Sequence, residues 1–200
     1  MMRIVQVSLP LVACGGIAAA QSSAILGQEN VEFARALFDV GYLDLAEGVC
    51  AVVERGDDGG DQAGEGFQFK ALRFELRLAG AKRVDDLNAR KQLIQKIIED
   101  SNAFIGEFAR TNTASIVRDK MPDAYLQLGE TLTEIIDREN DPAVITRLRG
   151  EGRDSFTQAT ESLKERMDRF GERLEDGGGV DRAYAEGQYV QSWYNLARTY

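Results

Sequence analysis

The sequence predicts an all-α fold, and three observations lead to this prediction. The chain of 200 residues contains only three prolines and few runs of β-branched residues. Apolar residues recur at three- and four-residue steps along most of the chain, which is the period of an amphipathic helix. No segment alternates between apolar and polar residues for long enough to predict a strand. Apolar residues make up 44% of the chain and charged residues 28%, as is typical of a folded globular protein.

Residues 1–20 are predicted to be a secretory signal peptide rather than part of the fold. Arg3 precedes a short apolar stretch that ends in Ala18-Ala19-Ala20, the small-residue pattern of a cleavage site. The protein is therefore expected to be exported to the periplasm or cell envelope, with residues 21–200 forming the folded part. The sequence LVAC at residues 11–14 also resembles a bacterial lipobox. In that alternative Cys14 would carry a lipid, and only then would the protein be attached to a membrane.

The first predicted hairpin covers about residues 24–56. Val31, Phe33, Ala34 and Leu37 share one side of its first helix, and Gly41 separates it from a second helix that contains Cys50. With Cys14 removed by cleavage, Cys50 would have no disulfide partner and is predicted to be a small buried residue. The loop GDDGGDQAGEG follows, and its aspartates do not have the spacing of a calcium-binding loop.

The second and third hairpins are predicted at about residues 64–110 and 113–175. In the second, a helix that ends at Gly80 is followed by a long helix from about Val84 to Arg110. In the third, the first helix begins at about Thr113 or Pro122, depending on how the proline is accommodated. Its second helix begins with Asp141 as the N-cap and Pro142 in the first position, and runs to about Glu175. A half-hairpin is predicted at residues 181–200.

Composition excludes several classes of function. The net charge of −9 would repel a phosphate backbone, so no nucleic-acid partner is expected. The chain has no histidine, the commonest general base and transition-metal ligand. It also contains no phosphate-binding glycine loop, no G-x-S-x-G, no H-E-x-x-H and no CxxC motif. We therefore predict no catalytic residues, no metal ligands and no cofactor, and the protein is not expected to be an enzyme.

Two segments share a four-residue signature. Trp193, Leu196, Ala197 and Tyr200 fit the pattern W-x2-L-G-x2-Y, with Ala in place of Gly. Tyr125, Leu128, Gly129 and Leu132 occupy the same positions, and the two small residues are 68 positions apart, twice a 34-residue period. The chain therefore resembles tetratricopeptide-repeat proteins across residues 24–56 and 122–200, with residues 64–110 more divergent. A generic helical bundle is the alternative fold.

The first hairpin resembles this family in a different way. Phe33, Ala34 and Leu37 match positions seven, eight and eleven of a repeat, and Gly41 lies at the turn between its helices. Cys50 stands where an aromatic residue is usual, and Asp58 occupies the place of the closing proline. The resemblance implies antiparallel hairpins stacked as an α-solenoid, some with elongated helices.

The family resemblance also implies a function. Proteins of this family are usually non-enzymatic scaffolds that bind a protein or peptide on a concave surface. Transferred position by position, the candidate contact residues are Arg35, Asp39, Glu130, Tyr194 and Arg198. Tyr200 would be position eleven of a repeat that continues, so the chain is expected to be the N-terminal part of a longer array. If the chain instead ends there, the Trp193 face is expected to dock a second copy or another protein.

A different function is suggested by the helix at residues 141–175. Phe156, Leu163 and Phe170 repeat at seven-residue intervals, and charged residues are dense on the outer face, as in a coiled coil. This seam could make the protein an oligomerisation module of the cell envelope. The alternative is that the seam packs against the preceding helix of the same chain.

Overall fold

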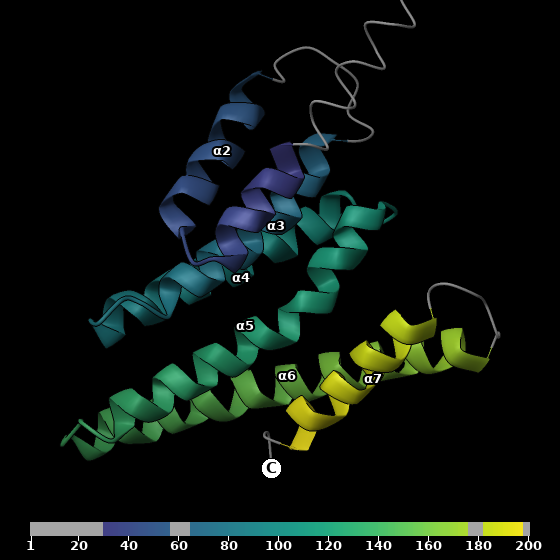
Figure 1. Cartoon of the computed structure of the whole chain (residues 1–200). Helices are drawn as coiled ribbons and strands as arrows, with labels where there is room; N and C mark the ends of the chain where they lie inside the picture. The colour runs from purple at the N-terminus through teal and green to yellow at the C-terminus, as the bar shows by residue number, and fades with distance from the viewer. Residues whose placement is uncertain (1–29, 57–64, 176–181, 198–200) are drawn as a thin grey trace, which may run out of the picture. The chain divides into compact units, whose positions relative to one another are not determined.

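The structure of the protein is a computed structural model, and it describes residues 30–56, 65–175 and 182–197. All regular secondary structure in these ranges is helical, which confirms the all-α prediction (Figure 1). The chain divides into two compact units, residues 1–66 and 67–200. The predicted signal peptide, including Cys14, lies outside the described residues.

The first unit contains a helical segment at residues 30–39 and helix α2 (Leu43–Gly56). The turn between them is made by Gly41, whose φ of 88° lies in the left-handed region. The N–H of Gly41 donates to the carbonyl of Phe38 at 2.9 Å, and the N–H of Tyr42 donates to that of Leu37 at 2.8 Å. This is the hydrogen-bond pattern of a Schellman C-cap, which favours glycine because it lacks a Cβ atom.

In the first unit the most deeply buried residues are small. Ala34, Ala46 and Cys50 are completely buried, and the prediction that Cys50 is a small buried residue is confirmed. Phe33, however, is 56% exposed. Because adjacent helical residues point about 100° apart, Phe33 and Ala34 cannot both lie at the centre of the buried face.

The second unit is built from α3 (Glu65–Ala81), α4 (Leu87–Glu107), α5 (Asn112–Ile136), α6 (Pro142–Glu175) and α7 (Arg182–Ala197). Its main core lies among α3, α4 and α5 and also contains Leu148 of α6. Large buried side chains of this core include Phe74, Ile94, Ile97, Met121, Leu128 and Leu132. Leu128 and Leu132, which the repeat signature had picked out, are therefore core residues. Asp86 and Thr111 cap α4 and α5 through hydrogen bonds from Ala89 and Ala114.

Helix α5 passes through Pro122 without ending. The sequence leaves two possible starts for this helix, Thr113 and Pro122. The structure shows one helix from Asn112 with Pro122 in its interior. Proline has no N–H, so the carbonyl of Arg118 loses its usual i→i−4 bond, and this commonly bends a helix. In Figure 1 the first turns of α5 run in a different direction from its remainder. The part of α5 that follows the buried proline therefore runs alongside α6.

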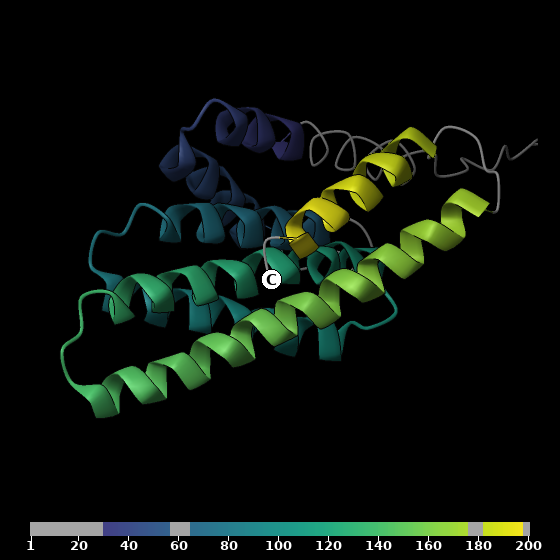
Figure 2. The same ribbon diagram turned by 90° about the horizontal axis from the view of Figure 1, so that it is seen from below.

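Helices α5, α6 and α7 form two successive antiparallel hairpins. Figure 2 shows α6 running beside α5, with α7 lying across it, and both pairs of helices are in contact. Asp141 caps α6 as predicted, because its Oδ1 accepts a hydrogen bond from the N–H of Ala143 at 2.8 Å. Leu163 is buried with Leu126 of α5, and Leu196 of α7 packs against this cluster.

The coiled-coil-like seam of α6 is covered by the same chain. Phe156 packs on α5 at Gly129, Leu163 is completely buried, and Phe170 is 2% exposed. The ring of Phe170 also makes an edge-to-face contact with Tyr184 of α7, with 6.0 Å between the ring centroids. The predicted alternative, intramolecular packing of this seam, is therefore what the structure shows.

Candidate functional site

The predicted contact residues fall in both units. Arg35 and Asp39 lie exposed on the helical segment 30–39 of the first unit. Glu130 on α5 and Tyr194 on α7 are exposed in the second unit, and Arg198 lies outside the described residues. The second unit alone places two of the predicted positions next to a pocket and an exposed aromatic surface.

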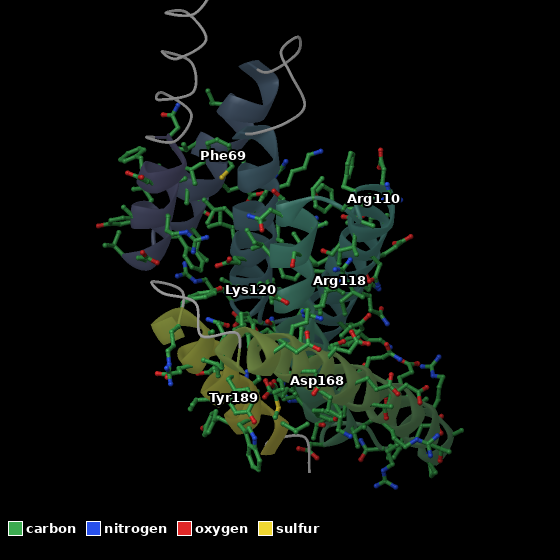
Figure 3. All side chains as sticks on the ribbon, turned by 90° about the vertical axis from the view of Figure 1, so that its right-hand side faces the viewer. Phe69, Arg110, Arg118, Lys120, Asp168 and Tyr189 are labelled. Atoms are coloured by element: carbon green, nitrogen blue, oxygen red, sulfur yellow. The ribbon has the colours of Figure 1, made fainter. Side chains whose placement is uncertain are left out.

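A pocket of about 360 Å³ lies where α3, α5 and α7 meet. Its apolar lining comes from Phe74 and Leu78 of α3 and Leu126 of α5. Its charged and amide lining is drawn from all three helices and from the turn after α3: Glu75, Lys82, Lys120, Asp123, Gln127, Glu130, Gln191 and Asn195. Figure 3 labels Lys120 on α5, at the level where this helix meets the α6–α7 pair. Three carboxylates and two ammonium groups therefore line one cavity together with apolar side chains.

Asp123 lies between α3 and α7 in this pocket. Its carboxylate accepts a hydrogen bond from Asn195 Nδ2 at 3.3 Å, which ties α5 to α7. Burial raises the pKa of Asp123, while the nearby charges of Arg166, Lys120 and Lys82 oppose this rise. Desolvation therefore outweighs three neighbouring cations, because none of them forms an ion pair with Asp123 among the described residues.

Gln127 lines the same cavity and carries a buried amide. The residue is 4% exposed, and its Nε2 donates to the carbonyl of Leu78 at 3.2 Å. This bond fixes the orientation of the amide, so Oε1 points away from the α3 carbonyl and finds no hydrogen-bond partner among the described residues. Burying such an acceptor unsatisfied costs about 1–3 kcal/mol.

Polar side chains form one part of the contact between α7 and helices α5 and α6. Arg166 of α6 is 2% exposed and donates through Nε to Ser192 Oγ at 2.7 Å and through Nη1 to the carbonyl of Asp119 at 2.6 Å. Ser192 in turn donates to the carbonyl of Gln188 at 2.6 Å. The side chain of Asp119 is paired with Arg169. A buried guanidinium thus links three helices and lies close to the pocket acid Asp123.

This polar attachment turns the aromatic side chains of α7 outward. Ser192 and Asn195 are buried, whereas Val190 is 65% exposed, Trp193 58% and Tyr194 64%. Residues three and four positions apart are neighbours on a helix surface, so Val190 adjoins both aromatic residues. We call Val190, Trp193 and Tyr194 the α7 patch. Tyr194 also lies three residues after Gln191, which lines the pocket, so the α7 patch begins at the rim of the pocket.

Sequence reasoning found only part of this site. It selected Glu130 and Tyr194, but it did not select Asp123, Gln127 or Arg166. One signal for Arg166 was present, because it lies three residues after Leu163 and four before Phe170. A charged residue on that apolar stripe indicates a buried ion that must find partners on a neighbouring helix.

Three further properties bear on function: possible metal sites, possible membrane spans and similarity to known proteins. No group of three or more Cys, Asp or Glu side chains in residues 30–56, 65–175 and 182–197 is arranged to hold a metal ion. Within the same ranges, no helix has both the length and the apolar character that are needed to span a bilayer. Comparison with protein-family models, curated proteins and solved structures gives no match.

Proposed function

We propose that the protein is a non-enzymatic helical scaffold that binds a segment of another protein at the α7 patch and the adjoining pocket. The observation that carries this proposal is the exposure of large apolar side chains on α7. Its buried side includes Ser192 and Asn195, and its exposed side carries Val190, Trp193 and Tyr194. Exposed aromatic residues clustered beside a cavity are typical of protein-binding surfaces, where Trp and Tyr supply most of the binding energy.

The chemistry of the partner is suggested by charge. The chain has a net charge of −9, so a positively charged partner segment would be attracted over a distance of about 8–10 Å at physiological salt. The α7 patch would contact apolar side chains of that segment. Two different kinds of contact, one apolar and one electrostatic, would then determine which partner binds.

The repeat architecture and export remain parts of the same proposal. Gly129 supports the repeat resemblance, because a close helix–helix contact is what the small residue of the signature provides. In an α-solenoid the first helices of successive repeats carry the binding surface, and α7 would be such a helix. Export to the cell envelope rests on residues 1–20 of the sequence alone.

The oligomerisation alternative depended on an apolar seam of α6 that would face a second copy. Leu163 and Phe170 are buried within the chain by α5 and α7, so the seam of α6 is not available to pair with a second copy. We therefore place the binding surface on α7 rather than on α6.

The proposal is tested by selecting peptides from a displayed random library against the whole chain. The selected peptides are then synthesised with a fluorescein label. Their affinities for the wild type, Trp193→Ser and Tyr194→Ser are measured by fluorescence anisotropy. A hot-spot contribution of about 2 kcal/mol predicts a loss of affinity of about 30-fold in either variant. Tyr42→Ser is the matched control, because Tyr42 is an equally exposed aromatic residue of the first unit.

Two results would contradict the proposed function. One is a library that yields no peptide with saturable binding. The other is a set of peptides whose affinities are unchanged in Trp193→Ser and Tyr194→Ser, or are reduced equally in the Tyr42→Ser control. The first result would contradict the proposal that the protein binds peptide segments. The second would show that the binding surface does not lie on α7.

A further inference from the structure

We infer that two copies of the chain pair through the outer face of α7, with the two helices antiparallel about a two-fold axis, and that this pairing covers the α7 patch. The consequence for peptide binding rests on the proposed function. The pairing itself rests on the shape and the charge of α7, and it involves neither the seam of α6 nor the pocket.

The outer face of α7 contains both a gap and a side chain that can fill it. No atom lies within 4 Å of the position where a Cβ of Gly187 would be, so the backbone is open there. Val190 and Tyr194 follow at steps of three and four residues and are exposed, so the three residues share one face of the helix. Closely paired helices use this arrangement, in which a large side chain of one helix enters a hole on the other.

The gap and the ring are placed so that one copy complements another. When two α7 helices run antiparallel with Tyr194 of each over Gly187 of the other, the two-fold axis passes between Val190 and Gln191. Both copies then make the same contacts, as a two-fold interface requires. Val190 of each copy lies beside the axis and meets its counterpart. A parallel pair in register would set glycine against glycine and ring against ring, and it would leave the gap unfilled.

The charge of α7 favours a second copy as the occupant of this face. Charged residues make up 28% of the chain, yet residues 187–197 contain none. The only charged residues of α7 are Arg182 and Glu186, whose Nε and Oε1 atoms pair at 3.1 Å. Two α7 helices can therefore meet at residues 187–194 without burying a charge or placing like charges opposite one another. The centres of protein interfaces are depleted of charge and enriched in aromatic residues in the same way.

The pairing is expected to be weak and to depend on salt. One pair of short helices gives an interface in the size class below about 1,200 Å², which is typical of transient complexes. Each copy carries a net charge of −9, which opposes association, so the dimer should become tighter as salt screens this repulsion. A positively charged peptide would show the opposite dependence on salt. A higher protein concentration should also cover the α7 patch and lower the apparent affinity for the peptide.

Sedimentation equilibrium of the full chain measures the pairing. The mean mass should rise from that of one chain toward twice that value between about 1 μM and about 1 mM protein, and should rise further in about 0.5 M salt. In Val190→Glu or Val190→Lys like charges meet at the axis, so either variant alone should associate at least about tenfold more weakly. An equimolar mixture of the two should recover the dimer, because opposite charges then meet. Val52→Glu, at a similarly exposed valine of the first unit, is the control and should associate like the wild type.

Three results would overturn the inference. The first is a mass that stays that of one chain at every concentration. The second is association that is affected equally by Val190→Glu and Val52→Glu, and the third is a mixture of Val190→Glu and Val190→Lys that associates no better than either variant alone.

Failure of the inference can be distinguished from failure of the proposed function. Peptides that depend on Trp193, bound by a chain that never dimerises, would leave the proposed function standing and overturn the pairing. A dimer with the expected response to the Val190 variants, but with no selected peptide, would support the pairing without the proposed function.

Discussion

The ring of Phe156 on α6 packs against the backbone of α5 at Gly129, where a Cβ atom would lie 2.7 Å from Cζ of the ring. Two other ring carbons would lie 2.8 and 2.9 Å from the same atom. Atoms this close repel strongly, so any residue larger than glycine would displace the ring. The small residue of the four-residue signature is therefore the residue on which α6 packs.

Gly129→Ala should therefore destabilise the protein. Overpacking in a closely packed contact costs about 1–3 kcal/mol, which exceeds the gain in helix propensity of about 1 kcal/mol. Gly150→Ala on α6 is the matched control, because no atom lies within 4 Å of the position where its Cβ would be. It should be neutral or stabilising by up to about 1 kcal/mol. Urea denaturation measures both free energies of unfolding, and equal stabilisation by the two substitutions would contradict the contact.

The sequence predicted α5 well because the information there is local. Leu128 and Leu132 recur at helical spacing around Gly129, and a stripe of this kind can only be buried against neighbouring helices. The bend at Pro122 could not be decided in the same way. Whether a proline ends a helix or bends it depends on the surrounding packing, and here the ring is buried in the second unit.

The site was less predictable because its parts are far apart in the sequence. Asp123 and Gln127 are polar residues four positions apart, which in isolation read as a solvated helix surface. They are enclosed only because α3 supplies Leu78 and α7 supplies Asn195. Likewise, the pattern alone could not show that Trp193 points outward, since this depends on Arg166 taking Ser192 as its partner.

Ser192→Ala should loosen α7 selectively. The substitution leaves the buried Nε of Arg166 without its acceptor, which costs about 1–3 kcal/mol or more because the donor is charged. Hydrogen exchange should accelerate in α7 more than in α3 or α4. In the double variant Arg166→Met/Ser192→Ala much of the loss should be recovered, because neither polar group then remains buried. Ser155→Ala, at a second buried serine on α6, is the control, and equal acceleration of α7 there would contradict the account.

Asp123→Asn should stabilise the protein at neutral pH. Because the pKa of Asp123 is raised on folding, the folded state holds this proton more tightly than the unfolded state. Stability is therefore lost as the pH rises from the ordinary Asp pKa through the raised value, and Asn, which resembles the neutral acid, does not suffer this loss. The gain over wild type should disappear at a pH below the ordinary Asp pKa.

Denaturation curves recorded across this pH range measure the effect. A variant that is less stable than wild type at neutral pH would show that the ionised carboxylate stabilises Arg166 more than burial penalises it.

Gly41→Ala should destabilise the first unit. The φ of 88° at Gly41 places a Cβ atom in strained contact with the backbone, at a cost of about 1 kcal/mol. Hydrogen exchange should increase in residues 30–39 and in α2, and the control is Gly48→Ala, where no atom lies within 4 Å of the added Cβ and the backbone is helical. Protection factors in α2 that are equal in the two variants would contradict the role of the left-handed turn.

The central claim is that α7 turns Trp193 and Tyr194 outward, and the fluorescence of Trp193 tests it most directly. Trp193 is the only tryptophan of the chain, so its emission reports on this surface alone. An exposed indole predicts red-shifted emission and quenching by acrylamide nearly as efficient as for free N-acetyltryptophanamide, in dilute protein without a partner. Blue-shifted emission that resists acrylamide would show that Trp193 is buried in the folded chain, and it would contradict both the orientation of α7 and the binding surface proposed on it.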